Sequence, residues 1–193
     1  MILSGYESSP LEGRMRRFVL ISGLVLVILV STLAFLFHDF FRAYAWHERN
    51  GDSVSIGSHR VAIPNNWEPS GPPNDLDMPT EGRAVIVRAA IMPWSRSNSS
   101  VHFEPLDDVI ESDAVVHDLV QAWARGDEGR FDLAASEVVT IKGRSISFHC
   151  VRRVYHNHEV GLMCLATGFE YNILSVSDSK VEAQVKDIIA SIE

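Results

Sequence analysis

FVLISGLVLVILVSTLAFLF, residues 18–37, is an unbroken run of 20 residues without a charged side chain. As an α-helix rising about 1.5 Å per residue, it would be about 30 Å long, which matches the hydrocarbon core of a bilayer. A helix also satisfies its own backbone hydrogen bonds there, where water is absent. This run therefore predicts a transmembrane helix over residues 18–37.

The residues on either side of the run predict its orientation. Arg14, Arg16 and Arg17 precede it and only Arg42 follows it closely, so the positive-inside rule places the N-terminus in the cytoplasm. Aromatic residues typical of a membrane interface follow the run, namely Phe40, Phe41, Tyr44 and Trp46. We expect a single-pass protein of the cell membrane whose C-terminal part is periplasmic or extracellular.

The alternative to this anchor is a cleaved signal peptide. Ala43-Tyr44-Ala45 fits the small-x-small pattern of a cleavage site, which would fall after Ala45. The apolar run exceeds the roughly 7–15 residues usual in a signal peptide, which favours a retained signal-anchor. We then expect a cytoplasmic tail over residues 1–17, a juxtamembrane helix or linker over residues 38–52 and an extracytoplasmic domain over residues 53–193. Either outcome leaves that domain outside the cytoplasm.

The charge of the chain argues against nucleic acid as a partner. The 193 residues carry a net charge of -8, and beyond residue 45 the 13 basic and 22 acidic residues give -9. Affinity for nucleic acid depends on Lys and Arg displacing counterions from phosphates, so an acidic domain repels such ligands. The hydrophobic fraction of 46% is sufficient for one folded domain besides the anchor.

The chain has two cysteines, Cys150 and Cys164, in two β-rich runs separated by the polar sequence His156-Asn157-His158. Asn tolerates the left-handed conformation that short hairpin loops require. With Asn157 at the centre of the turn, the two cysteines face each other across the strands, close enough for a disulfide. In an oxidising compartment we predict the Cys150–Cys164 disulfide; the alternative is a pair of buried free thiols.

The remaining patterns predict an α+β domain, a largely antiparallel sheet flanked by two helices in an α/β/α sandwich. Alternation of apolar and polar residues, with turn residues between, predicts the strands; helical spacing of apolar residues predicts the helices, the second with a capping box formed by Ser179 and Glu182. The expected strands are residues 53–56, 59–63, 83–92, 137–141, 144–155, 159–167 and 169–176, and the expected helices are residues 106–125 and 179–192.

Several of these positions form a pattern similar to a known superfamily. They are Gly57, Ile63-Pro64, Trp67, Lys142-Gly143, Tyr171, Ile188 and Ile192. In this order the chain resembles the PsbP-like α/β/α sandwich superfamily over residues 53–192, a pattern shared by small bacterial lipoproteins and membrane-anchored domains of unknown function. The resemblance implies a binding or assembly module and brings no catalytic residues or cofactor.

Only weak candidates for chemistry are present. His156, His158 and Glu159 at the hairpin tip could offer ligands to Zn²⁺ or Cu²⁺, but a metal site needs further ligands, and His149 lies too far along the strand. A polar, solvated turn is the simpler interpretation. No Ser or Cys stands in a nucleophile-elbow sequence and no glycine-rich phosphate loop follows a strand. We therefore predict no catalytic residues, no bound metal and no cofactor.

A set of apolar and aromatic residues falls in loops of the predicted domain. The candidate patch consists of Trp67, Pro72, Pro73, Met78 and Trp94, with Pro93 beside it. Such groups on long loops either form a surface for a protein partner or pack over the sheet edge as a small core. Our leading hypothesis is a non-enzymatic interaction, assembly or accessory module of the envelope. The rival is a metal-handling protein or enzyme that uses the hairpin-tip histidines.

Overall fold

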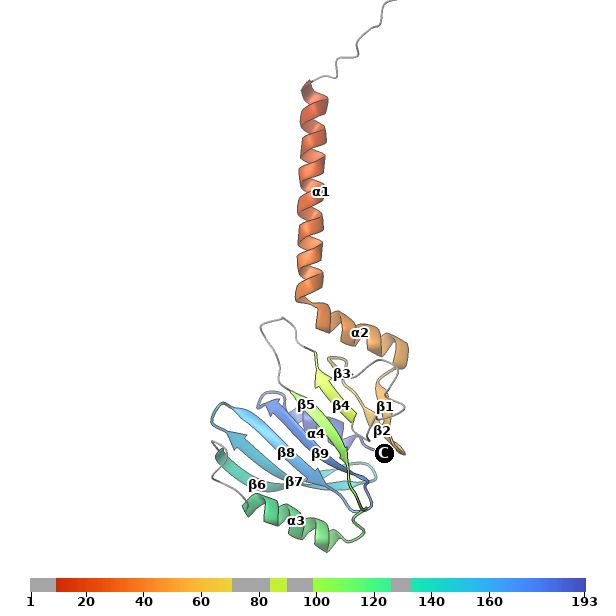
Figure 1. The fold of residues 1–193 in the computed structure, drawn as a ribbon, viewed down its shortest axis with the longest axis vertical. Coiled ribbons are helices and arrows are strands. Elements are labelled where there is room, and N and C mark those ends of the chain that lie inside the picture. The colour runs from red at the N-terminus through yellow and green to blue at the C-terminus, as the bar shows by residue number, and fades with distance from the viewer. Residues whose placement is uncertain (1–9, 71–83, 90–98, 126–132) are drawn as a thin grey trace, which may run out of the picture.

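The computed structural model describes residues 10–70, 84–89, 99–125 and 133–193. Helix α1 (Pro10–Leu36) stands clear of the rest of the chain, and helix α2 (His38–Asn50) joins it to an α+β domain (Figure 1). Helix α2 ends at Gly51, whose positive φ of 77° suits glycine and whose N–H donates to His47 O at 2.8 Å. Of the helix or linker expected over residues 38–52, residues 38–50 form a helix.

Within the described residues the domain has a two-stranded and a seven-stranded sheet, both antiparallel. The small sheet pairs β1 (Ser53–Ile56) with β2 (His59–Ala62), joined by a turn in which Gly57 has a φ of 58°. The large sheet runs in the order β3-β4-β5-β9-β8-β7-β6. Its strands are β3 (Trp67–Pro69), β4 (Ala84–Arg88), β5 (Ser100–Pro105), β6 (Leu133–Lys142), β7 (Ser147–Tyr155), β8 (Glu159–Leu165) and β9 (Tyr171–Asp178).

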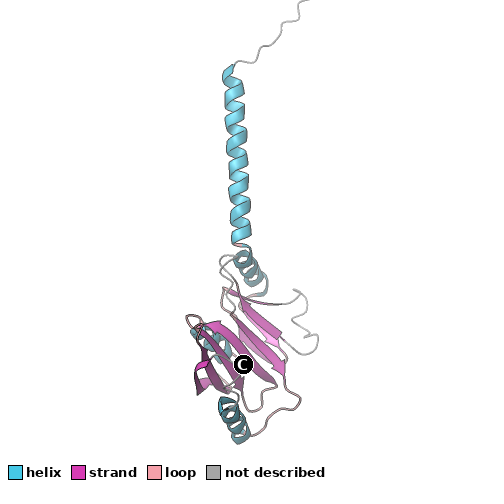
Figure 2. Cartoon of the chain, turned by 60° about the vertical axis from the view of Figure 1, so that its left-hand side comes forward, coloured by secondary structure: helices cyan, strands magenta, loops and turns pink. Residues whose placement is uncertain are grey.

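The two faces of the large sheet carry different helices. Helix α4 (Glu182–Ala190) covers one face together with the β1–β2 hairpin, and their side chains share the larger core with Phe148, Phe103 and Ile173. Helix α3 (Asp113–Arg125) covers the other face, where Val116 and Val120 pack on Val151 and Leu165. Figure 2 shows the helices on either side of the strands. The expected α+β class is confirmed.

The segment before α3 differs from the prediction. We expected a helix from residue 106, whereas Ser100–Pro105 forms β5 and the helix begins only at Asp113. Leu106 N donates to Glu170 O, and Gly168 N donates to Ile110 O, both at 2.9 Å, so residues 106–110 pair with a neighbouring segment rather than with themselves. Leu106 and Ile110 still pack against the smaller core, which explains why their spacing mimicked a helix.

The bounds of two further elements also differ from those predicted. Trp67–Pro69 is a short edge strand that the sequence did not suggest, and Pro at an edge costs the sheet no ladder bond. Helix α4 begins at Glu182 rather than at Ser179, and the predicted capping box is absent because its N-cap residue is Val181, with no side-chain cap bond. The Glu182 carboxylate instead points to charged partners described below.

Helix α1 exposes its apolar side chains along its length. Met15–Leu36 is long and apolar enough to cross a membrane, and none of its most apolar window is buried against the domain. Phe18, for example, is 73% exposed and Leu24 is 62% exposed. The chain therefore carries an exposed N-terminal hydrophobic helix of the kind found in signal sequences and membrane anchors.

Candidate functional surfaces

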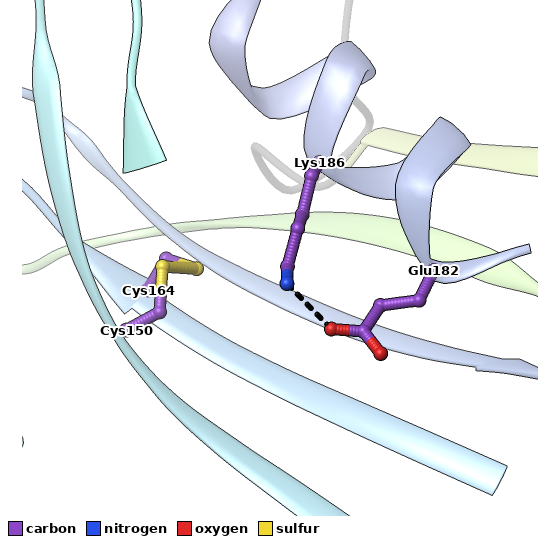
Figure 3. Close-up of a disulfide and its surroundings, with 4 residues drawn as sticks. All are labelled: Cys150, Cys164, Glu182 and Lys186. Carbon is purple, nitrogen blue, oxygen red and sulfur yellow. Dashed lines mark ion pairs between the residues drawn. A yellow bond between two sulfur atoms is a disulfide. The ribbon is translucent and has the colours of Figure 1, made fainter. Parts of the chain in front are cut away.

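The cysteine hairpin forms as predicted. Cys150 on β7 and Cys164 on β8 are directly paired, their Cα atoms lie 4.0 Å apart, and a disulfide joins them. Both are fully buried in the larger core, beneath α4 (Figure 3). The turn differs in one detail, since the residue with positive φ is His158 rather than Asn157. Asn157 Oδ1 instead accepts a hydrogen bond from Glu159 N at 3.1 Å.

The hairpin tip carries the three candidate metal ligands, His156, His158 and Glu159. His156 and His158 are exposed and Glu159 is half-buried. No group of three or more His, Cys, Asp or Glu in the described part of the chain is arranged to hold a metal ion.

A second pair of histidines, which the sequence did not bring together, lies between α3 and β7. His149 Nε2 is 3.3 Å from Asp113 Oδ1, and the His117 and His149 rings have their centroids 6.3 Å apart. Thr167 donates to the same Asp113 oxygen at 3.3 Å. These contacts link the start of α3 to the sheet, and the side chains of Asp113 and His117 are exposed to solvent.

Charged side chains brace α4 against the sheet near the disulfide. Arg152 on β7 donates through Nε and Nη2 to the two carboxylate oxygens of Glu182, at 2.7 and 2.8 Å, and through Nη1 to Glu137 at 3.1 Å. Lys186 lies 2.6 Å from the same Glu182 carboxylate (Figure 3). Hydrogen bonds from Arg152 are the main cause that lowers the pKa of Glu182 to about 2 from its ordinary value of 4.5. The bond to Glu182 likewise raises the pKa of Arg152.

The structure corrects one member of the predicted partner patch. Trp67 is fully buried in the larger core, and its indole Nε1 donates to Gln184 Oε1 at 3.1 Å. A residue so placed is not available to a partner, so for Trp67 the core interpretation holds. Pro72, Pro73 and Met78 lie within residues 71–83, and Pro93 and Trp94 lie within residues 90–98; both segments fall outside the described residues.

The chain attaches these two segments at opposite ends of one strand. Residues 71–83 lead into the start of β4 at Ala84, and residues 90–98 follow its end beyond Ala89. Five strand residues at about 3.3 Å each separate the two attachment points by roughly 17 Å.

Helix α2 is held on the domain by contacts of Arg42 and His47 that were not predicted from the sequence. Arg42 donates to the Glu68 carboxylate of β3 through Nε at 2.7 Å and also through Nη2. Glu68 is only 3% exposed, so this guanidinium is the partner that makes its burial tolerable. Hydrogen bonding to Glu68 is the main cause that raises the pKa of Arg42.

His47 makes the second attachment of α2. The buried ring places Nε2 at 2.9 Å from Trp67 O and 3.1 Å from Pro64 O, and Nδ1 at 3.0 Å from Asp52 Oδ1. Ala43 beside it is fully buried, and Trp46 packs against the larger core. Helix α2 is therefore part of the folded domain rather than a loose linker.

The outer side of α3 carries exposed apolar groups. Val115 is 47% exposed and Leu119 is 38% exposed, although the neighbouring Val116 and Val120 are fully buried against the sheet. One turn of helix separates Val115 from Leu119, so the two lie on the same side. In both views α3 lies at the end of the domain opposite α1 (Figures 1 and 2).

Comparison with known proteins adds no family assignment. No protein-family model matches the chain, and no curated protein sequence is significantly similar to it.

Proposed function

We propose that the chain is a single-pass, membrane-anchored module whose extracytoplasmic domain binds or assembles with a protein partner and performs no catalysis of its own. The observation that carries this proposal is the exposed apolar helix α1 joined to a domain with a buried disulfide. Exposed apolar surface of that extent is stable in lipid and not in water. Disulfides persist in oxidising compartments outside the cytoplasm.

The basic residues before the helix support one orientation. Arg16 and Arg17 lie at the N-terminal end of Met15–Leu36, and the only nearby Arg at the other end, Arg42, is paired with Glu68. The positive-inside rule then keeps the N-terminus in the cytoplasm and the domain outside. The finer α/β/α arrangement, with α3 and α4 on opposite sheet faces, is the feature that agrees with a PsbP-like binding or assembly module.

Two surfaces are candidates for the partner. The first is the outer side of α3 around Val115 and Leu119, whose exposed apolar side chains suit an interface. The second is the set predicted from the sequence alone, Pro72, Pro73, Met78 and Trp94, which lies outside the described residues. A metal-handling role for His156, His158 and Glu159 is the rival function.

Membrane fractionation and protease protection test the anchor. After alkaline washing of native membranes, the full-length chain should stay in the membrane pellet. Protease added outside intact cells without an outer barrier should digest the domain and leave an N-terminal tag protected. Full-length chain in the soluble cytosol would refute the proposal, and a soluble product that begins at residue 46 would replace the anchor with a cleaved signal peptide.

Site-specific photo-cross-linking tests the partner. A photoreactive residue in place of Leu119 should give a discrete adduct in native membranes, whereas the same residue in place of Arg144, whose side chain is 80% exposed, serves as the matched surface control. The same experiment is done with a photoreactive residue in place of Trp94. The absence of adducts from both Leu119 and Trp94 would refute the interaction role. Stoichiometric Zn²⁺ or Cu²⁺ in the purified chain, lost on changing His156 and His158 to Ala, would favour the rival.

A further inference from the structure

Helix α2 has two sides of different character. The side toward the domain contains buried Ala43 and His47, with Trp46 packed on the core. The other side exposes three aromatic rings, Phe40 at 41%, Phe41 at 56% and Tyr44 at 56%. At about 100° per residue, Phe41 lies roughly opposite Ala43 and Tyr44 lies about 100° from it, whereas Phe40 is about 60° from Ala43 and borders the buried side. The domain therefore covers one side of α2 and leaves an aromatic side open.

The position of this aromatic side is set by α1. Only Phe37 separates the two helices, and the backbone bonds Phe37 N to Leu33 O and Phe41 N to Phe37 O keep the junction tight. The uncharged run of residues 18–37 would be about 30 Å long as a helix, which fills the hydrocarbon core and ends where α2 begins. Helix α2 thus starts where the headgroup layer begins.

The direction of α2 keeps it at that depth. In Figure 1 it turns aside from the axis of α1 instead of continuing it. A helix that lies along the membrane surface with aromatic groups on one side is the usual form of an interfacial helix. Aromatic rings favour the headgroup region, where an apolar body and a polar end are both satisfied.

We propose that Phe40, Phe41 and Tyr44 lie in the lipid headgroup layer of the bilayer that α1 spans, and that α2 thereby fixes the orientation of the domain. The inference rests on the proposed membrane anchor. The contacts of Arg42 with Glu68 and of His47 with Trp67 O transmit the orientation of α2 to the sheet. The β3 edge then faces the membrane, and α3 points away from it (Figure 1).

Spin-label accessibility of the full-length chain in nanodiscs of phosphatidylcholine and phosphatidylglycerol tests this arrangement. Cys150 and Cys164 are disulfide-bonded, so a nitroxide reports only on an introduced cysteine. The informative variants are Phe41→Cys and Tyr44→Cys. Arg49→Cys is the matched control, since Arg49 is exposed on the same helix but not on its aromatic side, and Val25→Cys reports on the span.

We expect labels at residues 41 and 44 to be severalfold less accessible to a water-soluble nickel reagent than the label at residue 49, and the label at residue 25 to be the most accessible to oxygen. Equal nickel access at residues 41, 44 and 49, with residue 25 in the hydrocarbon core, would overturn the interfacial helix and leave the anchor intact. If residues 41 and 44 are accessible to nickel in nanodiscs but protected in native membranes, a protein partner rather than lipid covers them. That outcome would also overturn the interfacial helix. A water-exposed residue 25 would overturn the anchor itself.

Discussion

Replacing Glu182 by Gln should reveal how strongly the charged brace holds α4 on the sheet. The carboxylate is only 11% exposed and accepts two hydrogen bonds from Arg152. Its pKa of about 2, against an ordinary 4.5, corresponds to at most about 3 kcal/mol of stabilisation at neutral pH. Because the folded-state pKa is depressed, the contribution is complete above pH 4.5 and is lost as the pH falls toward 2.

Urea denaturation of the full-length chain in detergent micelles, followed by tryptophan fluorescence, measures the effect. At pH 7 the Glu182→Gln variant should unfold more easily than the wild type by about 2–3 kcal/mol, and by pH 3 roughly 2 kcal/mol of that difference should have disappeared. Glu137→Gln is the matched control, because Glu137 contacts the same Arg152 but is 57% exposed, and should cost under about 1 kcal/mol. A Glu182→Gln difference that stays constant from pH 7 to pH 3 would refute the reasoning.

Three further predictions use the same denaturation assay. Reducing the Cys150–Cys164 disulfide, whose sequence separation is 14, should lower the free energy of unfolding by about 3 kcal/mol, and equal stability of the oxidised and reduced chains would contradict this. Trp67→Ala should cost about 3–5 kcal/mol because the side chain is fully buried; a cost within experimental error would instead return Trp67 to the surface patch. Arg42→Ala should cost about 1–3 kcal/mol by leaving the buried Glu68 carboxylate unpaired, and amide hydrogen exchange in α2 should rise; unchanged exchange there would show that Arg42 does not hold the helix.

Local pattern was sufficient for the cysteine hairpin. The positions of Cys150 and Cys164 about Asn157 fixed the register because each one-residue shift would have reversed which side chains face the core. The same kind of signal was present in β5, where Val101 and Phe103 alternate with polar neighbours and are fully buried. We nevertheless predicted no strand over residues 100–105. A helix was expected from residue 106 instead, because Leu106 and Ile110, which are buried through pairing with residues 168–170, have the spacing of a helix.

The candidate surfaces depended on contacts between distant residues, which no local pattern reports. Trp67 in a loop-rich stretch suggests exposure, and only the presence of Gln184 on α4 and the surrounding core shows why it is buried. Glu68 likewise looks like a solvated loop charge until Arg42, 26 residues earlier, is found beside it. Glu182 suggested a capping role, but its actual contacts are determined by Arg152, which lies on strand β7.

The attachment of α2 argues for a domain held at a set orientation. A segment that only connects two parts needs no packing and is typically flexible and polar. Helix α2 instead buries Ala43 and His47 and supplies the guanidinium that pairs with Glu68. Pulling α2 away would separate the Glu68 carboxylate from Arg42, so the link and the fold stabilise each other. Since α2 follows directly on the apolar helix, an anchor in a membrane would through this coupling turn the outer side of α3, with Leu119, away from the lipid.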